Sequence, residues 1–292
     1  MSQQSNIPLG IGLMVLTTFV FAVQDGLSRH LAGEYNVLMV VMIRYWFFAA
    51  FVIALARRHA GGIRAAARTR QPILQATRGF LLAAEICVMV AAFTLLGLVE
   101  SHAVFTCYPL LVAALSGPVL GERVGWRRWA AIGVGFIGVL VILQPGFAVF
   151  DPAAAIPLLA AAMFAVYGLL TRYVAREDTT ATSFFWTGTM GAIAMTATGL
   201  WFWEPMTGGD WIYMACLCVT GVTGHWLLIR CYEVAEASAV QPFAYLQLVF
   251  AAIIGMSIFG ETLRTNVVIG AGMIVAAGLF TFWRERLQRV AD

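Results

Sequence analysis

The chain has 292 residues, of which 61% are hydrophobic and 11% charged, and its mean hydropathy is +0.84. A soluble domain is about half apolar and about a quarter charged, so this composition excludes a chain surrounded by water and predicts a protein that lies mostly in lipid. The net charge is +3 and all 18 basic residues are Arg, but no basic run interleaved with aromatic residues occurs, which argues against a nucleic-acid partner.

The hydrophobic pattern predicts ten membrane-spanning helices, since a span takes about 20 residues. The expected spans, in chain order, are 7–28, 36–56, 73–97, 101–121, 127–144, 153–173, 180–203, 211–231, 237–259 and 266–284. Several prolines lie at the proposed boundaries, where a helix tolerates them best. We expect no cleavable signal peptide, because Met1 to Asn6 carries no positive charge and the first apolar run is too long.

The arginines of the links predict the orientation of these spans. One set lies in alternate links and consists of Arg57, Arg58, Arg64, Arg68, Arg70, Arg123, Arg127, Arg128, Arg172, Arg176, Arg230, Arg284, Arg286 and Arg289. Because positive residues stay on the cytoplasmic side, we expect both termini to be cytoplasmic in a bacterial inner membrane. Merging the third and fourth spans across the short link at 97–101 would break this alternation, so we reject that alternative.

The chain also repeats internally. Residues 21–32 and 164–175 are identical at six of twelve positions, and the matches include Arg29 with Arg172. The turn Gly121-Glu122 and the later Gly133 match Gly260-Glu261 and Gly272 at the same offset along the chain. Each half, 1–147 and 148–292, then holds five spans, and an odd number forces the second half to enter the membrane from the opposite side. We therefore predict an all-α membrane protein of two inverted five-helix repeats with a solute site between them.

Two five-helix halves that each close with a Gly-Glu turn and a glycine-rich helix resemble the drug/metabolite transporter superfamily, EamA branch, over essentially the whole chain. The aromatic richness resembles the bacterial aromatic amino acid and paraquat exporters of that branch. This resemblance implies an inner-membrane exporter whose cavity is lined by helices 1–4 and 6–9, with helices 5 and 10 as supports. One departure is that Pro109 in the fourth span has no counterpart at the same place in the ninth, where Pro242 lies earlier.

Ionisable side chains inside the spans are the first candidates for function, because a charge at the centre of a membrane helix costs about 2.5 kcal/mol or more. We expect Asp25 and Arg44 to pair for structural reasons, and His102 to be solvated. Glu85 and His225 lie on symmetry-related helices, and two interpretations stay open. They form either a cavity-facing pair that binds the solute or relays protons, or a buried hydrogen bond between helices.

Aromatic, amide and proline residues complete the expected site. The substrate-binding candidates are Gln24, Glu85, Met89, Tyr108, Tyr167, Trp186, His225 and Tyr245, and the gating candidates are Pro109, Pro118 and Pro242. For any single aromatic residue, packing against lipid or core is the competing interpretation, just as a static kink is for the prolines. Glycines 133, 135 and 138, with 270, 272 and 278, are expected to allow close helix packing.

The five cysteines all fall in apolar stretches, so we expect neither a disulfide nor a metal site, and we expect no cofactor. No P-loop, GxSxG or HExxH motif occurs, which leaves ATP drive and the common hydrolytic sites without support. The leading prediction is a secondary or facilitative exporter of amino acids, with a broad preference for apolar and aromatic ones. It would work by alternating access around a central cavity. Its expected partners are the solute and the surrounding membrane lipids, and it would act as a monomer or a homodimer.

Two alternatives remain. The first is an exporter of drugs or organic cations, for which Glu85 would be the key charge. The second is a membrane-embedded enzyme that acts on lipid substrates with Glu85 and His225 as acid and base. An enzyme would be expected to cluster its acidic and histidine residues at one interface, whereas this chain scatters single polar residues through its spans, which favours transport.

Overall fold

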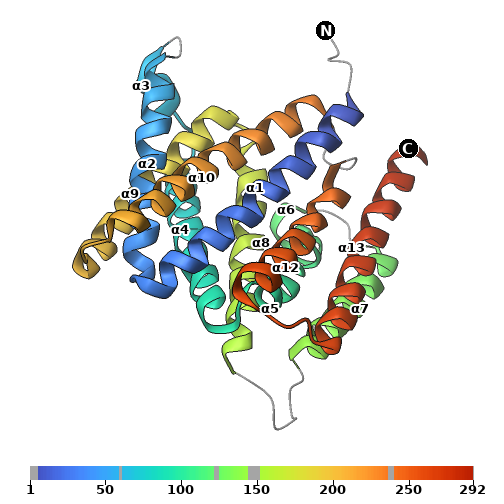
Figure 1. Cartoon of the computed structure of the whole chain (residues 1–292). Coiled ribbons are helices and arrows are strands. Elements are labelled where there is room, and N and C mark those ends of the chain that lie inside the picture. Colours follow the sequence, from blue (N-terminus) through green and yellow to red (C-terminus); the bar gives the residue numbers. More distant parts are fainter. Residues whose placement is uncertain (1–5, 59–60, 122–124, 144–151, 236–239, 292) are drawn as a thin grey trace.

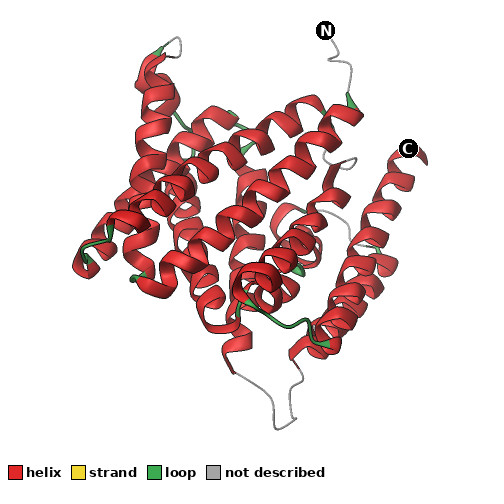
Figure 2. Cartoon of the chain, in the orientation of Figure 1, coloured by secondary structure: helices red, strands yellow, loops and turns green. Residues whose placement is uncertain are grey.

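A computed structural model describes residues 6–58, 61–121, 125–143, 152–235 and 240–291. These described residues form helices joined by short loops and contain no strand (Figure 2), which confirms the all-α prediction. Six of the described helices are long and apolar enough to cross a membrane, and three shorter helices are also apolar. The chain is therefore a multi-pass membrane protein.

Each of the ten expected spans has a helical counterpart. The first half contains α1 (Ile7–Glu34), α2 (Val37–Arg58), the short α3 (Gly62–Ala67), α4 (Pro72–Leu96), α5 (Leu98–Phe105), α6 (Tyr108–Leu120) and α7 (Trp126–Leu143). The second half contains η1 (Pro152–Ala155), α8 (Ile156–Val174), α9 (Thr180–Gly199), η2 (Leu200–Phe202), α10 (Gly208–Val234), η3 (Gln241–Tyr245), α12 (Leu246–Phe259) and α13 (Thr265–Ala291).

The first, fourth and tenth spans differ most from their predicted bounds, and α13 continues seven residues past the expected end at 284. Helix α1 continues six residues past the expected end at 28, because Asp25, His30 and their neighbours bond to other helices instead of to water. The fourth span begins at Leu98 and is divided at 106–107 into α5 and α6. The third and fourth spans are separate helices, since Gly97 ends α4 with φ +86°, a conformation that favours glycine.

The packing of the helices repeats when the two halves are exchanged. Helix α1 packs on α10 and α12, and its counterpart α8 packs on α4 and α6, the counterparts of those two helices. Helices α2 and α9 pack directly on each other, as do α7 and α13. Figure 1 shows α1 starting at the end of the bundle where α8 finishes, so corresponding helices run in opposite directions. This is the expected inverted arrangement.

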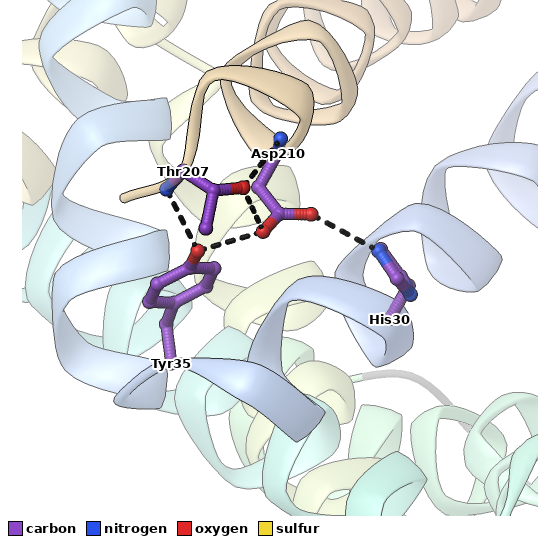
Figure 3. Close-up of polar contacts among 4 residues, drawn as sticks. All are labelled: His30, Tyr35, Thr207 and Asp210. Carbon is purple, nitrogen blue, oxygen red and sulfur yellow. Dashed lines mark hydrogen bonds and ion pairs between the residues drawn. The ribbon is translucent and has the colours of Figure 1, made fainter. Parts of the chain in front are cut away.

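The start of α1, the α3 segment and the end of α13 all lie at one end of the bundle (Figure 1). We call it the arginine-rich end, because the 57–71 link and Arg172 and Arg176 belong to it. The other end holds the junction of α1 with α10 (Figure 3). There the Asp210 carboxylate accepts from the Tyr35 hydroxyl at 2.7 Å and lies 3.4 Å from His30.

Helices α7 and α13 form a close pair beside the rest of the bundle (Figure 1). A Cβ atom placed on Gly138 would lie 2.7 Å from the Gly270 carbonyl oxygen, so the two backbones need glycine at their contact. Gly133 and Gly272 face open space and have no such role, which corrects the expectation that all six glycines form packing faces.

Candidate functional site

A cavity with about 310 Å³ of space not filled by protein atoms lies between the two halves. We call it the central cavity, and it is lined by Arg44, Tyr45 and Phe48 of α2, Leu82 and Ile86 of α4, and Cys218, Gly221, Val222 and His225 of α10. Because α2 and α4 belong to the first half and α10 to the second, the cavity lies at the boundary that an inverted repeat predicts for a solute site.

Gly221 lets two polar side chains of the first half approach α10. A Cβ atom at this position would lie 3.3 Å from Oε1 of Gln24 and 3.4 Å from Nε of Arg44. Any larger side chain would push the amide or the guanidinium away, so glycine keeps both groups at the wall of the cavity.

Several polar groups around this cavity have no partner among the described residues. Oε1 of Gln24 and the Tyr45 hydroxyl are buried and accept or donate no hydrogen bond in that part of the chain. Within the same described residues, the Arg44 guanidinium forms no ion pair. Buried polar groups in proteins are almost always paired with protein or ordered water, so the wall of this cavity is polar on the side of Gln24, Arg44 and Tyr45.

Glu85 adds a carboxyl group to the same region. The residue is 4% exposed; the Asp25 carboxylate disfavours a negative charge on it and Arg44 favours one, although Arg44 does not lie within ion-pair distance. The Tyr45 hydroxyl in turn interacts with Arg44, Glu85 and Tyr167. The region therefore combines one cation, one carboxyl group and phenol hydroxyls within a short space.

The remaining wall of the central cavity is aromatic. The His225 ring stacks on Phe48 with centroids 5.8 Å apart and planes 9° apart, and it meets Phe21 edge-on at 5.3 Å. Rings at 4.5–7 Å attract one another through their quadrupoles. A flat apolar group of a solute would find the same kind of contact here.

One expected pairing, and one of two open interpretations, are absent from the described residues. No hydrogen bond or ion pair joins Glu85 to His225, so the inter-helix hydrogen bond is not formed; His225 lines the central cavity, and Glu85 precedes the lining residue Ile86 on α4. Asp25 does not pair with Arg44 either, because it turns toward His102 and Gln247 and lies 3.0 Å from each. His102 is 3% exposed, which corrects the expectation that it is solvated.

A second cavity of about 400 Å³ lies where the fourth and ninth spans are interrupted. We call it the proline cavity, and it is lined by His102, Phe105, Thr106, Tyr108, Pro109, Ala244, Tyr245, Gln247 and Leu248. Pro109 lies in the first turn of α6 and Pro242 in the first turn of η3, while Pro118 lies inside α6. The chain is thus broken on both sides of this cavity. A gating role for the three prolines stays a prediction.

The structure separates the predicted binding residues into groups. Gln24, Glu85 and His225 lie at or beside the central cavity, and Tyr108 and Tyr245 line the proline cavity. Met89 is buried in the apolar core and lines neither cavity. Trp186 also lies outside both cavities, because its indole N–H donates to the Ala67 carbonyl of α3 at 3.1 Å, at the arginine-rich end. Trp226, another mid-span aromatic residue, is 51% exposed.

Arg78 was missed as a candidate. It is 1% exposed in α4, its Nε donates to the Thr171 hydroxyl at 2.9 Å, and it also donates to Gln75. Its guanidinium lies 5.2 Å from the centre of the Tyr167 ring. The signal was present, because a single arginine within an apolar span marks a functional or structural site.

The second Gly-Glu turn closes the bundle at the end opposite the arginine-rich end. The two carboxylate oxygens of Glu261 accept hydrogen bonds from the backbone N–H groups of Leu98 and Val99, each at 2.8 Å, at the start of α5. Glu261 also pairs with Arg29. The turn of one half therefore caps a helix of the other half. The corresponding Glu122 lies outside the described residues.

Comparison with known proteins agrees with this architecture. The EamA-like transporter family model matches residues 8–144 and 152–283. An S-adenosylmethionine uptake transporter of Rickettsia prowazekii is 26% identical over 280 residues, which cover 95% of this chain and 93% of that protein. A riboflavin transporter of Vibrio cholerae is 27% identical, with 97% and 96% covered, and a pseudopaline exporter of Pseudomonas aeruginosa is 25% identical, with 92% and 94% covered.

One solved crystal structure shares the fold, with a TM-score of 0.61 and 20% identity over 92% of this chain and 95% of the other. The relatives are named for S-adenosylmethionine, riboflavin and pseudopaline, not for amino acids of the apolar or aromatic class. Since the family model covers nearly the whole chain in two repeats, the resemblance to the EamA branch is confirmed. The protein belongs to the EamA-like transporter family of membrane transporters.

Proposed function

We propose that this protein is a secondary or facilitative carrier for solutes that combine an α-amino carboxylate with a flat ring, above all the aromatic amino acids, which it exports. The observation that carries the proposal is Arg44, a guanidinium without an ion pair among the described residues, at the wall of a cavity whose other side is aromatic.

The chemistry of the cavity fits both ends of such a solute. Arginine binds carboxylates through two parallel hydrogen bonds, so Arg44 would hold the carboxylate. Glu85 would attract the ammonium group, and Phe48 and His225 would contact the ring.

The names of the relatives support the same solute class. S-adenosylmethionine carries an amino acid group together with a flat adenine ring, and riboflavin carries a flat ring system. At 25–27% identity these names do not transfer to this chain. They make S-adenosylmethionine the second solute to test after tryptophan and phenylalanine.

The proposed topology places the arginine-rich end in the cytoplasm of a bacterial cell, with both termini there and the bundle in the inner membrane. We take residues 1–147 and 148–292 as the two moving units. The breaks beside Pro109 and Pro242, together with Pro118, would give the helices the freedom to open one side of the cavity at a time.

The rival function is export of organic cations, and Glu85 is the observation that favours it. A buried carboxyl group without a hydrogen bond from the described residues suits a cation that lacks a carboxylate. Tryptamine tests this alternative, since it is tryptophan without the carboxylate.

The deciding experiment is counterflow in liposomes that contain only the purified protein. Liposomes are loaded with unlabelled solute, and the entry of labelled tryptophan, phenylalanine, S-adenosylmethionine or tryptamine is measured. We expect tryptophan to exchange. Arg44→Gln should reduce its exchange about 10–100-fold, because a hydrogen bond to a charged group contributes about 1.5–3 kcal/mol.

Arg127→Gln is the matched control, because Arg127 is an exposed arginine next to Trp126 and far along the chain from the cavity. It should leave the exchange unchanged. Faster exchange of tryptamine than of tryptophan, with no effect of Arg44→Gln, would establish the cation carrier instead. If no solute exchanges faster than in empty liposomes, the proposal is wrong.

A further inference from the structure

Asp25 of α1, His102 of α5 and Gln247 of α12 form a buried polar cluster beside the proline cavity. Oδ2 of Asp25 lies 3.0 Å from Nε2 of His102 and accepts from Nε2 of Gln247 at 3.0 Å. The side chains of Asp25 and His102 are 13% and 4% exposed. The cluster joins helices of both halves, and the proposed solute site does not use it.

The hydrogen bonds of His102 indicate how many protons the Asp25–His102 pair holds. Nδ1 lies 3.0 Å from the backbone carbonyl oxygen of Leu98. A carbonyl oxygen only accepts, so Nδ1 carries a hydrogen. The contact between Nε2 and the Asp25 carboxylate also needs a hydrogen, held either by the ring or by the carboxyl group. The pair therefore holds one proton more than a neutral histidine beside a carboxylate would hold.

The surroundings hold the ring in place and set it at the wall of the proline cavity. The Phe93 ring stacks on His102 with centroids 5.1 Å apart and planes 5° apart. Both His102 and Gln247 line the proline cavity, which lies at the breaks of the fourth and ninth spans. A proton on the pair would thus have a path through the cavity once either break opens.

Other charged groups set when this proton leaves. The titratable and charged groups on the packed elements include Arg29 of α1, Arg44 of α2, Glu85 of α4, Glu100 of α5, Tyr108 of α6, His225 of α10, Tyr245 of η3, and Glu261 after α12. Arg29 is already paired with Glu261. Glu85 interacts electrostatically with Asp25, so a solute ammonium group that binds at Glu85 disfavours the extra positive charge on the Asp25–His102 pair.

We propose that the Asp25–His102 pair is the binding site of a coupling proton, released when the solute binds and taken up again from the opposite face. The step is balanced: the proton passes to water and leaves an Asp25 carboxylate and a neutral His102, and the return proton restores the first state. Transport is then an exchange of one proton for one solute. This inference rests on the proposed solute site.

The test measures proton movement and solute movement together. Liposomes containing the protein and a trapped pH-sensitive dye receive tryptophan, and the protons moved per solute are determined from the two signals. We expect about one proton per solute for the wild type and no proton movement for Asp25→Asn, whose amide can still donate to Nε2 of His102. His102→Gln should abolish proton movement as well.

Asp210→Asn is the matched control, because Asp210 also contacts a histidine, His30 (Figure 3), but lies in the first turn of α10 and lines neither cavity. Its proton-to-solute ratio should equal that of the wild type. Counterflow of labelled tryptophan is measured on the same liposomes. A wild type without counterflow would refute the proposed function, whereas wild-type counterflow with a proton ratio that survives Asp25→Asn and His102→Gln would refute only this inference.

A second measurement needs no variant. Tryptophan added to the wild-type protein in weakly buffered detergent should release protons in proportion to the solute bound. Solute binding without proton release would overturn the proposal. Release that is lost in Glu85→Gln but kept in Asp25→Asn would also overturn it, and would assign the proton to Glu85.

Discussion

At the scale of single residues, Gly221 determines how closely Gln24 and Arg44 of the first half approach α10 at the proposed solute site. Gln24 and Arg44 both reach the position where a side chain at residue 221 would begin. The glycine therefore acts by leaving room, and it supplies no chemistry of its own. Its importance follows from the unpaired polar groups that it admits to the cavity wall.

This role predicts the effect of Gly221→Leu. The new side chain should fill the space beside Arg44, and the Michaelis constant for tryptophan should rise by about tenfold or more, as expected for losing a hydrogen bond to a charged group. Initial rates in liposomes measure it. Gly12→Leu is the control, since Gly12 faces open space on α1. Equal Michaelis constants for the two variants would contradict the assigned position of the site.

The sequence identified many of these residues but not their partners. Asp25 and Glu85 are recognisable because each is an acidic residue inside an apolar span. Which neighbour each one meets depends on the rotation of α1 and α4, and hydrophobic patterns do not determine that rotation when a helix is apolar all round. For this reason the expected pairing of Asp25 with Arg44 was wrong, and Arg78 was overlooked although the same rule applies to it.

At the scale of the elements, the Gly-Glu turn works as a cap that one half supplies to the other. The backbone N–H groups at the start of a helix need acceptors, and a carboxylate also interacts well with the helix dipole there. Glu261 meets both needs for α5. Gly97 permits this approach, because a Cβ atom there would lie 2.7 Å from Oε1 of Glu261.

Removal of this cap should destabilise the protein. Glu261→Ala loses both backbone hydrogen bonds and the pair with Arg29, so we expect a loss of about 1–2 kcal/mol and a lower melting temperature in detergent. Glu261→Gln keeps one acceptor oxygen, and its melting temperature should fall between those of the wild type and Glu261→Ala. Glu34→Ala, at the exposed end of α1, is the control. A melting temperature of Glu261→Ala equal to that of the control would show that the cap does not stabilise the protein.

The sequence predicted the helices well because span length and apolar runs are imposed by the bilayer. It also indicated breaks at Pro109 and Pro242, since proline removes a backbone hydrogen bond. The end of α1 was placed too early, because the polar residues from Asp25 to His30 resemble a link. Their partners on α5 and α10 keep them helical, and those partners are visible only in the folded chain.

At the scale of the whole molecule, the inverted repeat explains why the proposed solute site lies between the two halves. The weak sequence match of residues 21–32 with 164–175 and the alternation of arginines predicted two opposed halves. The structure adds that each half packs mainly against the other, with α1 on α10 and α8 on α4. Neither signal predicts this exchange of partners, because helix periodicity does not identify which helix a face contacts.

In the proposed mechanism, a cavity between the two halves binds solute and opens alternately to each side. Cys218 lines that cavity, so it serves as a probe in a protein whose other four cysteines are replaced by alanine. The rate of its reaction with a membrane-impermeant thiol reagent is measured in vesicles of both orientations, with and without tryptophan. We expect Cys218 to react from both faces of the membrane, and tryptophan to slow the reaction in each case. Reaction from one face only, or a rate that tryptophan does not change, would contradict it.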